Sequence, residues 1–504
     1  MRIKELLTVQ NGLALAVGSL LAAFVGMILF KFHFQYTDMD QVIQWYGRSE
    51  FAKGNVHMIR FFGQEYGTML EAFVALIFPF WLPDLALPMS TCLLFFMAYS
   101  MPLRLAESKT TYFILTASFL CLMPIEYYMI SFMPRDFISG IFITSLAFLF
   151  ARKDRWWSHI LVGFFCILGW SFNNNAAILG GCLSVFVAFP NNRLSVSAVM
   201  YMAVGYAVGG SFHLALAHYF EMHPELIVHK AWDFHYAWKQ LWDGWKNLDR
   251  HFAWINPAFH YQGWLYLPLL LSILIYAWIK KQYAVLASTI TLFVMVFLSF
   301  GVLKIHDGRD SVFFSHERMF LALPITVLFL ISQFNWSIKG LKVLAGIGIV
   351  SVVFSIWGID EVIANQVRTN ADHVVSVTPV DEFYNDCQAL HALSEKFDAE
   401  ILLIGPNAEQ FGHIHSSGCN SIYDDIYVID PGYERKTWDM RAIDTMRVSQ
   451  FIWHSTRLAH AEISSPTVSS LTEIEGFPNT FLVKGSEMNA LEIYRSLGVE
   501  TSNY

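Results

Sequence analysis

Two aspartates, Asp38 and Asp40, follow the first long apolar run of the chain by only a few residues. A carboxylate can act as a general base, and a second one beside it can orient a hydroxyl group or an ion. At this spacing the two side chains share a face only if the segment is extended, because on a helix they diverge. The pair indicates acid–base chemistry, with two solvated loop acids as the alternative.

A turn between two glycines comes next. The stretch GQEYGTMLEAF (63–73) places Gln64, Glu65 and Tyr66 between the glycines. It leads into VALIFPFWLP, an apolar stretch that is too short and too interrupted by proline to cross a membrane. We expect that stretch to form a helix along the membrane surface.

A third acid, Asp136, lies in SFMPRDFISG at the start of a later apolar run. It is a candidate second acid, and the alternative is that it caps the N-terminus of the following helix. Its neighbour Arg135 can bind an anionic group, or it can extend its guanidinium to lipid headgroups.

Segment 304–318 (KIHDGRDSVFFSHER) supplies fixed positive charge through Lys304, His316 and Arg318. Arg318 precedes the apolar run FLALPITVLFL, so its guanidinium lies at membrane depth, where a bidentate phosphate contact is favoured. A headgroup anchor is the alternative. His316 and Glu317 could ligate a metal, but no H-x-x-x-H or cysteine cluster accompanies them. We predict no structural zinc, and a weakly bound divalent cation at the acids stays open.

Composition shows which elements must position these residues. The chain is 55% hydrophobic and only 15% charged, which excludes an ordinary soluble enzyme, and its net charge of −8 gives no sign of a nucleic-acid partner. Apolar length predicts about eleven membrane spans. We place them near 10–31, 86–104, 110–129, 137–151, 158–172, 175–190, 195–217, 264–279, 283–303, 319–334 and 341–358.

Lysine and arginine set the predicted orientation, because they concentrate in cytoplasmic loops. Those that fall on one side are Arg2, Lys4, Arg104, Lys109, Arg152, Lys153, Arg155, Arg193, Lys280, Lys281, Lys339 and Lys342. The N-terminus is then cytoplasmic, and loops 32–85, 218–263 and 304–318 lie on the outer face. We expect a polytopic all-α bundle over 1–358 and an outer domain over 359–504.

The C-terminal stretch 359–504 alternates between strand-like and helix-like segments, which predicts a small α/β domain outside the membrane. Strands are expected at 399–407 and 481–485, and helices at 437–455 and 490–497. Its two cysteines, Cys387 and Cys419, are predicted to form a disulfide in an oxidising compartment.

Loop 218–263 contains tryptophans at helical spacing, Trp238, Trp242 and Trp245, beside a separate polar row. We predict an amphipathic helix at the membrane interface, with stacking against acceptor sugar rings as the alternative role for its aromatic face.

The acidic pair and the Gly-Gln-x-Tyr-Gly…Leu-Glu-Ala element together resemble polytopic glycosyltransferases of the GT-C class, which take sugar from a polyprenyl-phosphate carrier. One departure is Thr68, where bacterial relatives usually have a second glycine after Gly67. The resemblance implies an inverting displacement at the anomeric carbon, with a carboxylate base and a departing lipid phosphate. It makes Asp38 and Asp40 the base and its supporting acid, in either order.

The resemblance therefore implies transfer of a sugar to a cell-envelope glycan, lipid or protein, which we expect on the periplasmic face of a bacterial inner membrane. Asp136 is the expected second acid, and Arg318, Lys304, His316 and Arg135 are the expected phosphate ligands. A polysaccharide ligase or polymerase would depend on Arg and His of a late loop instead. A lipid-glycan flippase or transporter would carry charges within its spans.

Overall fold

The computed structural model of the chain divides into two compact units. The first comprises Met1–His33, Pro88–Ala215 and Trp232–Ala371, and the second comprises Phe34–Leu87, Leu216–Ala231 and Asp372–Tyr504. The structure describes residues 9–64, 66–106, 108–151, 155–227, 235–257, 262–370, 377–405, 411–456, 466–499 and 501. Glu65 and the basic residues Arg2, Lys4, Arg152 and Lys153 lie outside these ranges.

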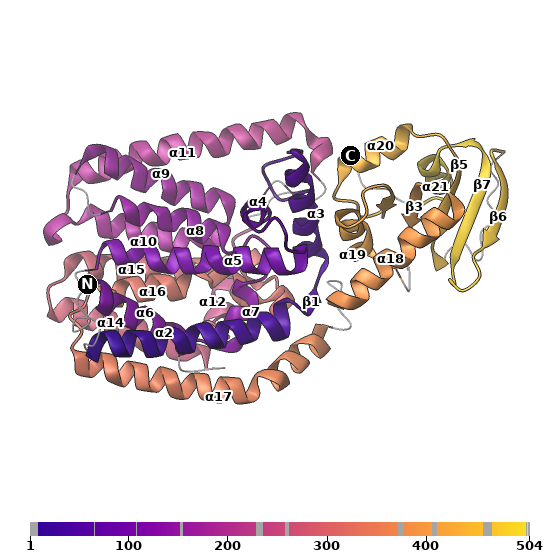
Figure 1. The fold of residues 1–504 in the computed structure, drawn as a ribbon. Coiled ribbons are helices and arrows are strands. Elements are labelled where there is room, and N and C mark those ends of the chain that lie inside the picture. Colours follow the sequence, from indigo (N-terminus) through magenta and orange to yellow (C-terminus); the bar gives the residue numbers. More distant parts are fainter. Residues whose placement is uncertain are drawn as a thin grey trace. The chain divides into compact units, whose positions relative to one another are not determined.

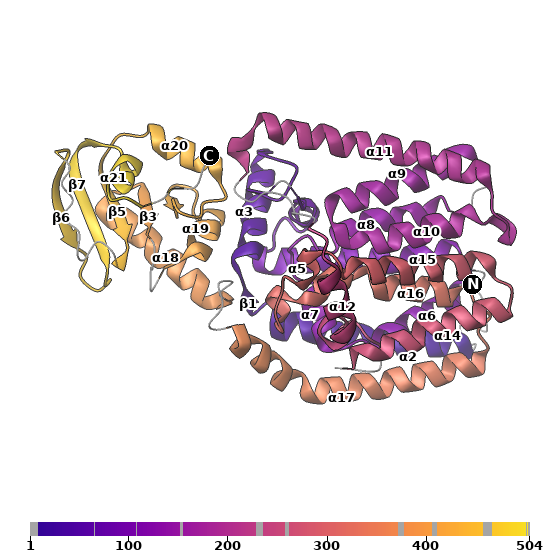
Figure 2. The ribbon, with the colours of Figure 1, turned by 180° about the vertical axis from the view of Figure 1, so that it is seen from behind.

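The first unit is a bundle of apolar helices (Figures 1 and 2). Helices α2, α6 and α17 pack together, and α10 packs against both α9 and α15. Its helices are α2 (Val9–Ile28), α6 (Lys109–Cys121), α7 (Ile125–Ser131), α8 (Ser139–Ser145), α9 (Trp156–Phe172), α10 (Ala177–Ala188), α12 (Trp238–Lys246), α13 (Leu248–Phe252), α14 (Tyr266–Ile279), α15 (Tyr283–Ser299), α16 (Ala322–Ser332) and α17 (Ile338–Asn370). Two of the boundaries between the two units fall within α5 (Pro83–Ser100) and α11 (Val196–Met222).

Four helical segments of the described chain are long and apolar enough to cross a membrane: Val9–His33, Pro83–Arg104, Val196–Met222 and Ile338–Asn370. A fifth span results if α6 and α7, which meet at a bend of 103°, are counted as one. Eleven spans are not confirmed. The other predicted spans coincide with shorter helices, such as α9 and α10 on either side of the turn at Asn174.

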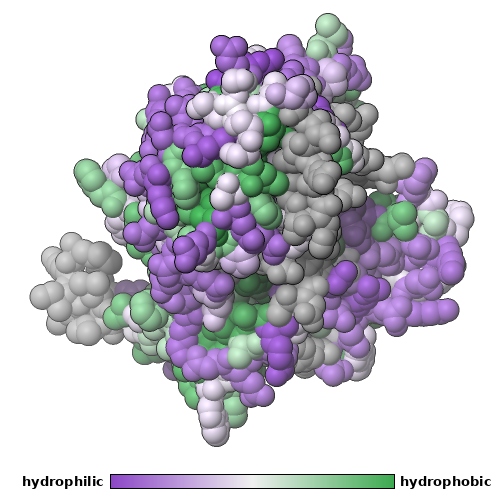
Figure 3. Space-filling model, turned by 90° about the vertical axis from the view of Figure 1, so that its right-hand side faces the viewer, coloured by the Kyte–Doolittle hydropathy of each residue, from purple (hydrophilic) through white to green (hydrophobic). Residues whose placement is uncertain are grey.

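The second unit contains a five-stranded sheet in the order β4-β3-β5-β7-β6. Strand β3 (Ile401–Ile404) pairs in parallel with β4 (Tyr427–Ile429) and β5 (Val448–His454), whereas β7 (Thr480–Met488) is antiparallel to β5 and to β6 (Val468–Glu473). The accompanying helices are α18 (Val380–Phe397), α19 (His413–Gly418), α20 (Thr437–Thr445) and α21 (Ala490–Ser496). On the side of β6 and β7, most of the visible surface is hydrophilic (Figure 3), as expected for a strand whose residues are mostly exposed.

The first loop of the sequence shares a hydrophobic core with this sheet domain. Val42 and Trp45 of α3 (Met39–Lys53) pack in one cluster with Phe383 and Leu390 of α18. A short antiparallel pair joins β1 (Tyr36–Thr37) to β2 (Thr378–Pro379). The second unit includes the first loop, and its C-terminal segment begins at residue 372. The boundary expected from composition, at residue 359, lies inside α17.

The structure contains most of the strands and helices predicted for the C-terminal region. Strand β3 and helix α21 lie where the sequence indicates them, but the helix predicted over 437–455 is wrong in its second half. Helix α20 ends at Thr445, and the β-favouring sequence VSQFIWH forms β5 between β3 and β7. A disulfide joins Cys387 of α18 to Cys419 after α19.

The helix predicted around the tryptophans of loop 218–263 is present as α12, with Trp238 and Trp242 largely exposed. It ends at Lys246, and Arg250 belongs to the next helix, α13. Trp245 instead packs against Phe293 and Phe297 of α15.

Candidate active site

Asp38 is the N-cap of α3. Its backbone is extended, and its Oδ1 accepts hydrogen bonds from the backbone N–H groups of Asp40 (2.9 Å) and Gln41 (3.2 Å). Its Oδ2 accepts from the side-chain amide of Gln41 at 2.6 Å. The side chain is fully buried. Asp38 therefore fixes the start of the helix, as a carboxylate at this position is suited to do.

Asp40 lies in the first turn of α3, and its carboxylate is partly accessible. Its Oδ1 forms an ion pair of 2.7 Å with Arg435, and the side chain of Asp40 is 26% exposed whereas that of Arg435 is 4% exposed. Burial lowers the pKa of Arg435, but the charge of Asp40, with the hydrogen bond to the Tyr433 hydroxyl, outweighs it and raises that pKa above its ordinary value. The guanidinium is thus permanently charged, and it fixes the position of the Asp40 carboxylate.

The glycine-bracketed turn packs directly on Arg435. Gly63 has a φ of 73°, and a Cβ there would approach the Arg435 Cβ to 3.0 Å and its Cα to 3.1 Å. A glycine is needed at this position for both reasons. Tyr66 also adds to the electrostatic environment that raises the Arg435 pKa, while Gln64 is buried and Glu65 lies outside the described residues.

Helix α3 holds the other end of this turn through Gln44. The side-chain amide of Gln44 donates to the carbonyl of Thr68 at 3.2 Å, and its Oε1 accepts from the backbone N–H of Ala72 at 3.2 Å. Thr68, the residue that departs from the Gly-Gly pattern, is therefore held through its backbone and remains compatible with the turn.

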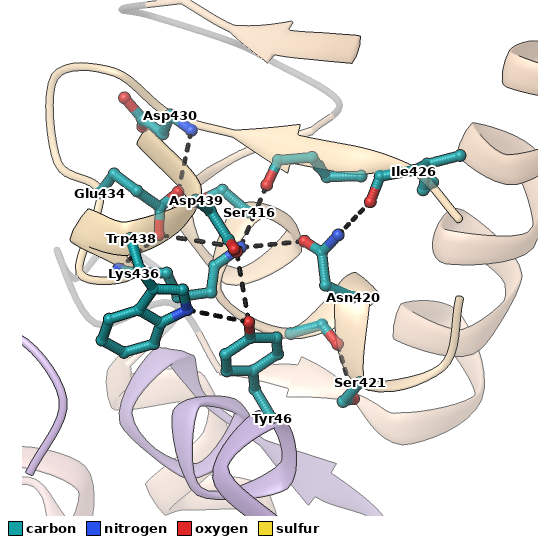
Figure 4. Close-up of polar contacts among 12 residues, drawn as sticks. Tyr46, Ser416, Asn420, Ser421, Ile426, Asp430, Glu434, Lys436, Trp438 and Asp439 are labelled. Carbon is teal, nitrogen blue, oxygen red and sulfur yellow. Dashed lines mark hydrogen bonds and ion pairs between the residues drawn. The ribbon is translucent and has the colours of Figure 1, made fainter. Parts of the chain in front are cut away.

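Arg435 is held in place by the residues around it in the chain. Lys436 is fully buried, and its Nζ donates to Asn420 Oδ1 (2.9 Å) and to the Val428 carbonyl (3.4 Å) and pairs with Asp439 (3.3 Å) (Figure 4). On the α3 side, Trp438 Nε1 donates to the Tyr46 hydroxyl at 3.1 Å (Figure 4). This network fixes the segment after β4 that carries Arg435.

Glu434 completes this segment. Its Oε1 accepts from the backbone N–H of Lys436 at 2.9 Å and its Oε2 from that of Asp430 at 3.3 Å. Burial raises the pKa of Glu434 to about 7, against the opposing charge of Lys436. The carboxyl therefore titrates close to neutral pH.

In the first unit, Asp136 occupies a left-handed backbone conformation with φ 71°, and its side chain is buried. It does not cap α8, whose N-cap is Ile138. Asn173 Nδ2 donates to the Asp136 carbonyl at 3.0 Å, and Asn175 Nδ2 donates to the Phe137 carbonyl at 2.8 Å. The polar break of the sequence between α9 and α10 thus holds the turn that carries Asp136.

Two predicted phosphate ligands hold segment 304–318 by its backbone. Arg135 Nη1 donates to the Phe313 carbonyl, and Arg318 Nη2 donates to the Asp307 carbonyl at 2.9 Å. The Arg318 guanidinium also lies 4.0 Å from the ring centre of Phe314. Lys304 forms an ion pair with Asp307 and remains partly exposed.

His316 is buried and accepts a hydrogen bond at Nε2 from Arg250 Nε at 2.7 Å. Burial, together with the charges of Arg250 and Arg318, lowers the pKa of His316 to about 4. It is therefore neutral at pH 7 and cannot add positive charge for a phosphate. Within the described ranges, no group of three or more His, Cys, Asp or Glu side chains is arranged to hold a metal ion.

The predicted site residues thus lie in two groups. Asp38, Asp40 and the glycine-bracketed turn belong to the second unit, and Asp136 and the basic residues belong to the first. The sequence reasoning missed Arg435, which lies in the run DPGYERK after a short strand. An aspartate, proline and glycine followed by charged residues are typical of an ordinary turn. The role of Arg435 is therefore evident only from its contact with α3 in the structure.

Comparisons with known proteins give no independent guide to the family: no family model matches the chain, and no curated protein matches it significantly.

Proposed function

We propose that this protein is an integral-membrane glycosyltransferase that transfers one sugar from a polyprenyl-phosphate donor to a cell-envelope acceptor on the periplasmic face. The observation that supports it most is the Asp40–Arg435 ion pair, which holds a partly exposed carboxylate at the start of the helix that follows the first apolar span. A fixed, accessible carboxylate at that place has the properties that a general base for an acceptor hydroxyl needs.

Asp40 is the proposed base, and Asp38 is the supporting acid. Asp38 is fully buried, and both of its carboxylate oxygens accept hydrogen bonds that begin α3. Asp40 retains access to solvent. Because Asp38 fixes the first turn of the helix, it positions Asp40 without contacting the acceptor.

The proposed reaction is a single inverting displacement. Asp40 takes the proton of the acceptor hydroxyl as that oxygen forms a bond to the anomeric carbon. The bond from this carbon to the phosphate oxygen breaks, and the electron pair leaves with the lipid phosphate. Arg318, Lys304 and Arg135 are the proposed source of positive charge for the departing phosphate, and Asp136 is the proposed second acid.

The test is comparative glycan mass spectrometry of cells with and without the gene. We expect one envelope glycoconjugate to lose the mass of a single hexose or pentose when the gene is deleted. If every envelope glycan is unchanged, the proposal is wrong and a transporter becomes the better hypothesis.

Asp40→Asn tests the base in the same cells. The substitution preserves shape but removes the charge that pairs with Arg435, so membrane insertion and thermal unfolding are measured beside transfer. We expect transfer to fall about 10²- to 10⁴-fold, the usual contribution of a general base. Glu382→Gln, at an exposed acid in the first turn of α18, is the matched control and should restore the glycan fully. Full transfer by Asp40→Asn would remove Asp40 from the mechanism.

A further inference from the structure

The first unit contains a polar cavity with a volume of about 860 Å³. This lies within the range of about 300 to 1,000 Å³ that small-molecule sites occupy. Its walls come from α7, from α13 and the residues after it, from segment 304–318, and from the last turns of α17. The proposed transfer mechanism uses none of the side chains that line it.

The cavity has a buried floor. Glu126, Trp254, Glu317 and Gln366 line it and are each no more than 8% exposed. Glu317 accepts hydrogen bonds from the backbone N–H of Trp254 (3.0 Å) and from the Ser315 hydroxyl (2.9 Å). Burial, with a contribution from the charge of Glu126, raises the pKa of Glu317 well above its usual value. In its protonated form, a carboxyl group can donate a hydrogen bond as well as accept one.

The rim is exposed and carries mixed charge. Lys246, Arg250 and Arg309 supply positive charge, and Asp249, Asp310 and Glu361 supply negative charge. Apart from Glu317, whose protonated form burial favours, four carboxyl groups of the lining oppose three cationic side chains. Such a lining disfavours an anionic ligand. It suits a ligand with many hydroxyl groups, because carboxylates accept hydrogen bonds from hydroxyls, and side-chain amides both donate hydrogen bonds to them and accept hydrogen bonds from them.

We propose that this cavity binds a saccharide that carries no phosphate. The choice of a saccharide rests on the proposed function. The size of the cavity, its acidic balance, the amides of Asn247 and Gln366, and the Trp254 side chain in its wall support it. Arg250 links this site to the basic segment, because it lines the cavity and also donates to His316.

Protection of an introduced cysteine tests the proposal on the full chain in detergent. Asn365 is exposed at the rim on α17, and Asn365→Cys places a thiol there. The free cysteines of the described chain are all buried, so background labelling by a maleimide is low. Methyl glycosides of glucose, galactose and N-acetylglucosamine are the probes, and inorganic phosphate is the anionic comparison.

We expect at least one methyl glycoside to slow labelling of Asn365→Cys by threefold or more, and phosphate to have no effect. Asp360→Cys is the matched control on the same helix, because Asp360 is exposed, lies outside the cavity and pairs with Lys31. Its labelling rate should not change. Adding Glu361→Gln to the Asn365→Cys chain should weaken the protection.

Protection by phosphate alone would overturn the proposal in favour of an anion site, and protection by no glycoside at 100 mM would overturn it outright. Equal protection with and without Glu361→Gln would also contradict it. These outcomes are separate from the glycan analysis of deletion cells, which tests transfer. A deletion without effect on any glycan contradicts the proposed function even if a glycoside protects.

Discussion

At the residue scale, Asp38 and Asp40 are similar in sequence and different in structure. Their type and their position after an apolar run could be predicted from the sequence, and so could an acidic candidate base. Their division of labour could not. It depends on α3 beginning at Met39, which makes Asp38 a buried cap, and on Arg435, which lies 395 residues away from Asp40.

Substitutions at Asp38 separate capping from charge. Asparagine caps helices about as well as aspartate, so Asp38→Asn should lower stability little, whereas Asp38→Ala should cost about 1 to 2 kcal/mol. Thermal unfolding of the purified protein in detergent measures both. A loss of stability for Asp38→Asn as large as that for Asp38→Ala would show that the buried charge, rather than the cap, is what matters.

Glu434 makes stability depend on pH. Its folded-state pKa of about 7 is above the ordinary value of 4.5, so the folded state favours the protonated form. The contribution of Glu434 to the free energy of unfolding is complete below pH 4.5 and is lost as the pH rises through 7. Between pH 5 and pH 6.5 the free energy of unfolding falls by about 2 kcal/mol for this reason. We expect the melting temperature to fall over this interval.

Glu434→Gln is the test, because it keeps one acceptor oxygen and does not titrate. The variant should show a flatter pH dependence between pH 5 and pH 6.5. The hydrogen bond to Asp430 raises the pKa of His413. This histidine therefore also lowers stability as the pH rises, but only at higher pH than Glu434 does. An unchanged slope in Glu434→Gln would assign the pH dependence to another group.

At the element scale, the glycine-bracketed turn at 63–67 packs on Arg435 through Gly63, and Gln44 of α3 holds the residues that follow it. Its glycines and its position before an apolar stretch were visible in the sequence, but its contact with Arg435 was not. The region 437–455 shows the same limit. Its first half has helical periodicity, and its second half becomes a strand because β3 and β7 are available to pair with it.

Two glycines of similar conformation provide a controlled test of this turn. Gly54, the C-cap of α3, has a φ of 87° and no atom within 4 Å of a built Cβ, whereas Gly63 has a φ of 73° and meets Arg435. Gly54→Ala should therefore cost about 1 kcal/mol, from backbone conformation alone. Gly63→Ala should cost more in thermal unfolding and should also reduce transfer. Equal effects on stability and activity would show that the contact with Arg435 is unimportant.

At the scale of the whole molecule, composition identified the apolar runs and the change in character near residue 359. It could not show that residues 34–87 fold with residues 372–504, because composition records where the chain is apolar and not which segments pack together. The apolar residues of α3 are buried because they pack against α18 and α19. The same applies to the spans, since an apolar run does not show by itself whether its helix is long enough to cross a membrane.

The disulfide gives a prediction about this second unit. It closes a loop with a sequence separation of 32 residues, for which chain entropy predicts a stabilisation of roughly 3 to 4 kcal/mol. We expect Cys387→Ser/Cys419→Ser to lower the melting temperature, and the native chain to migrate differently on reducing and non-reducing gels after alkylation. Cys166→Ala, at a free buried cysteine, controls for the loss of a thiol. Equal mobility would show that the pair is not oxidised in the cell.

The pairing of β1 with β2 also has a consequence for biosynthesis. Tyr36 leaves the ribosome early, and its partner Pro379 follows after most of the chain has been made. At about 5 to 20 residues per second, this delay is on the order of tens of seconds. During that time the apolar side of α3 lacks its partner, and Asp40 lacks Arg435. We therefore expect the second unit to fold only after residues 372–504 have been made.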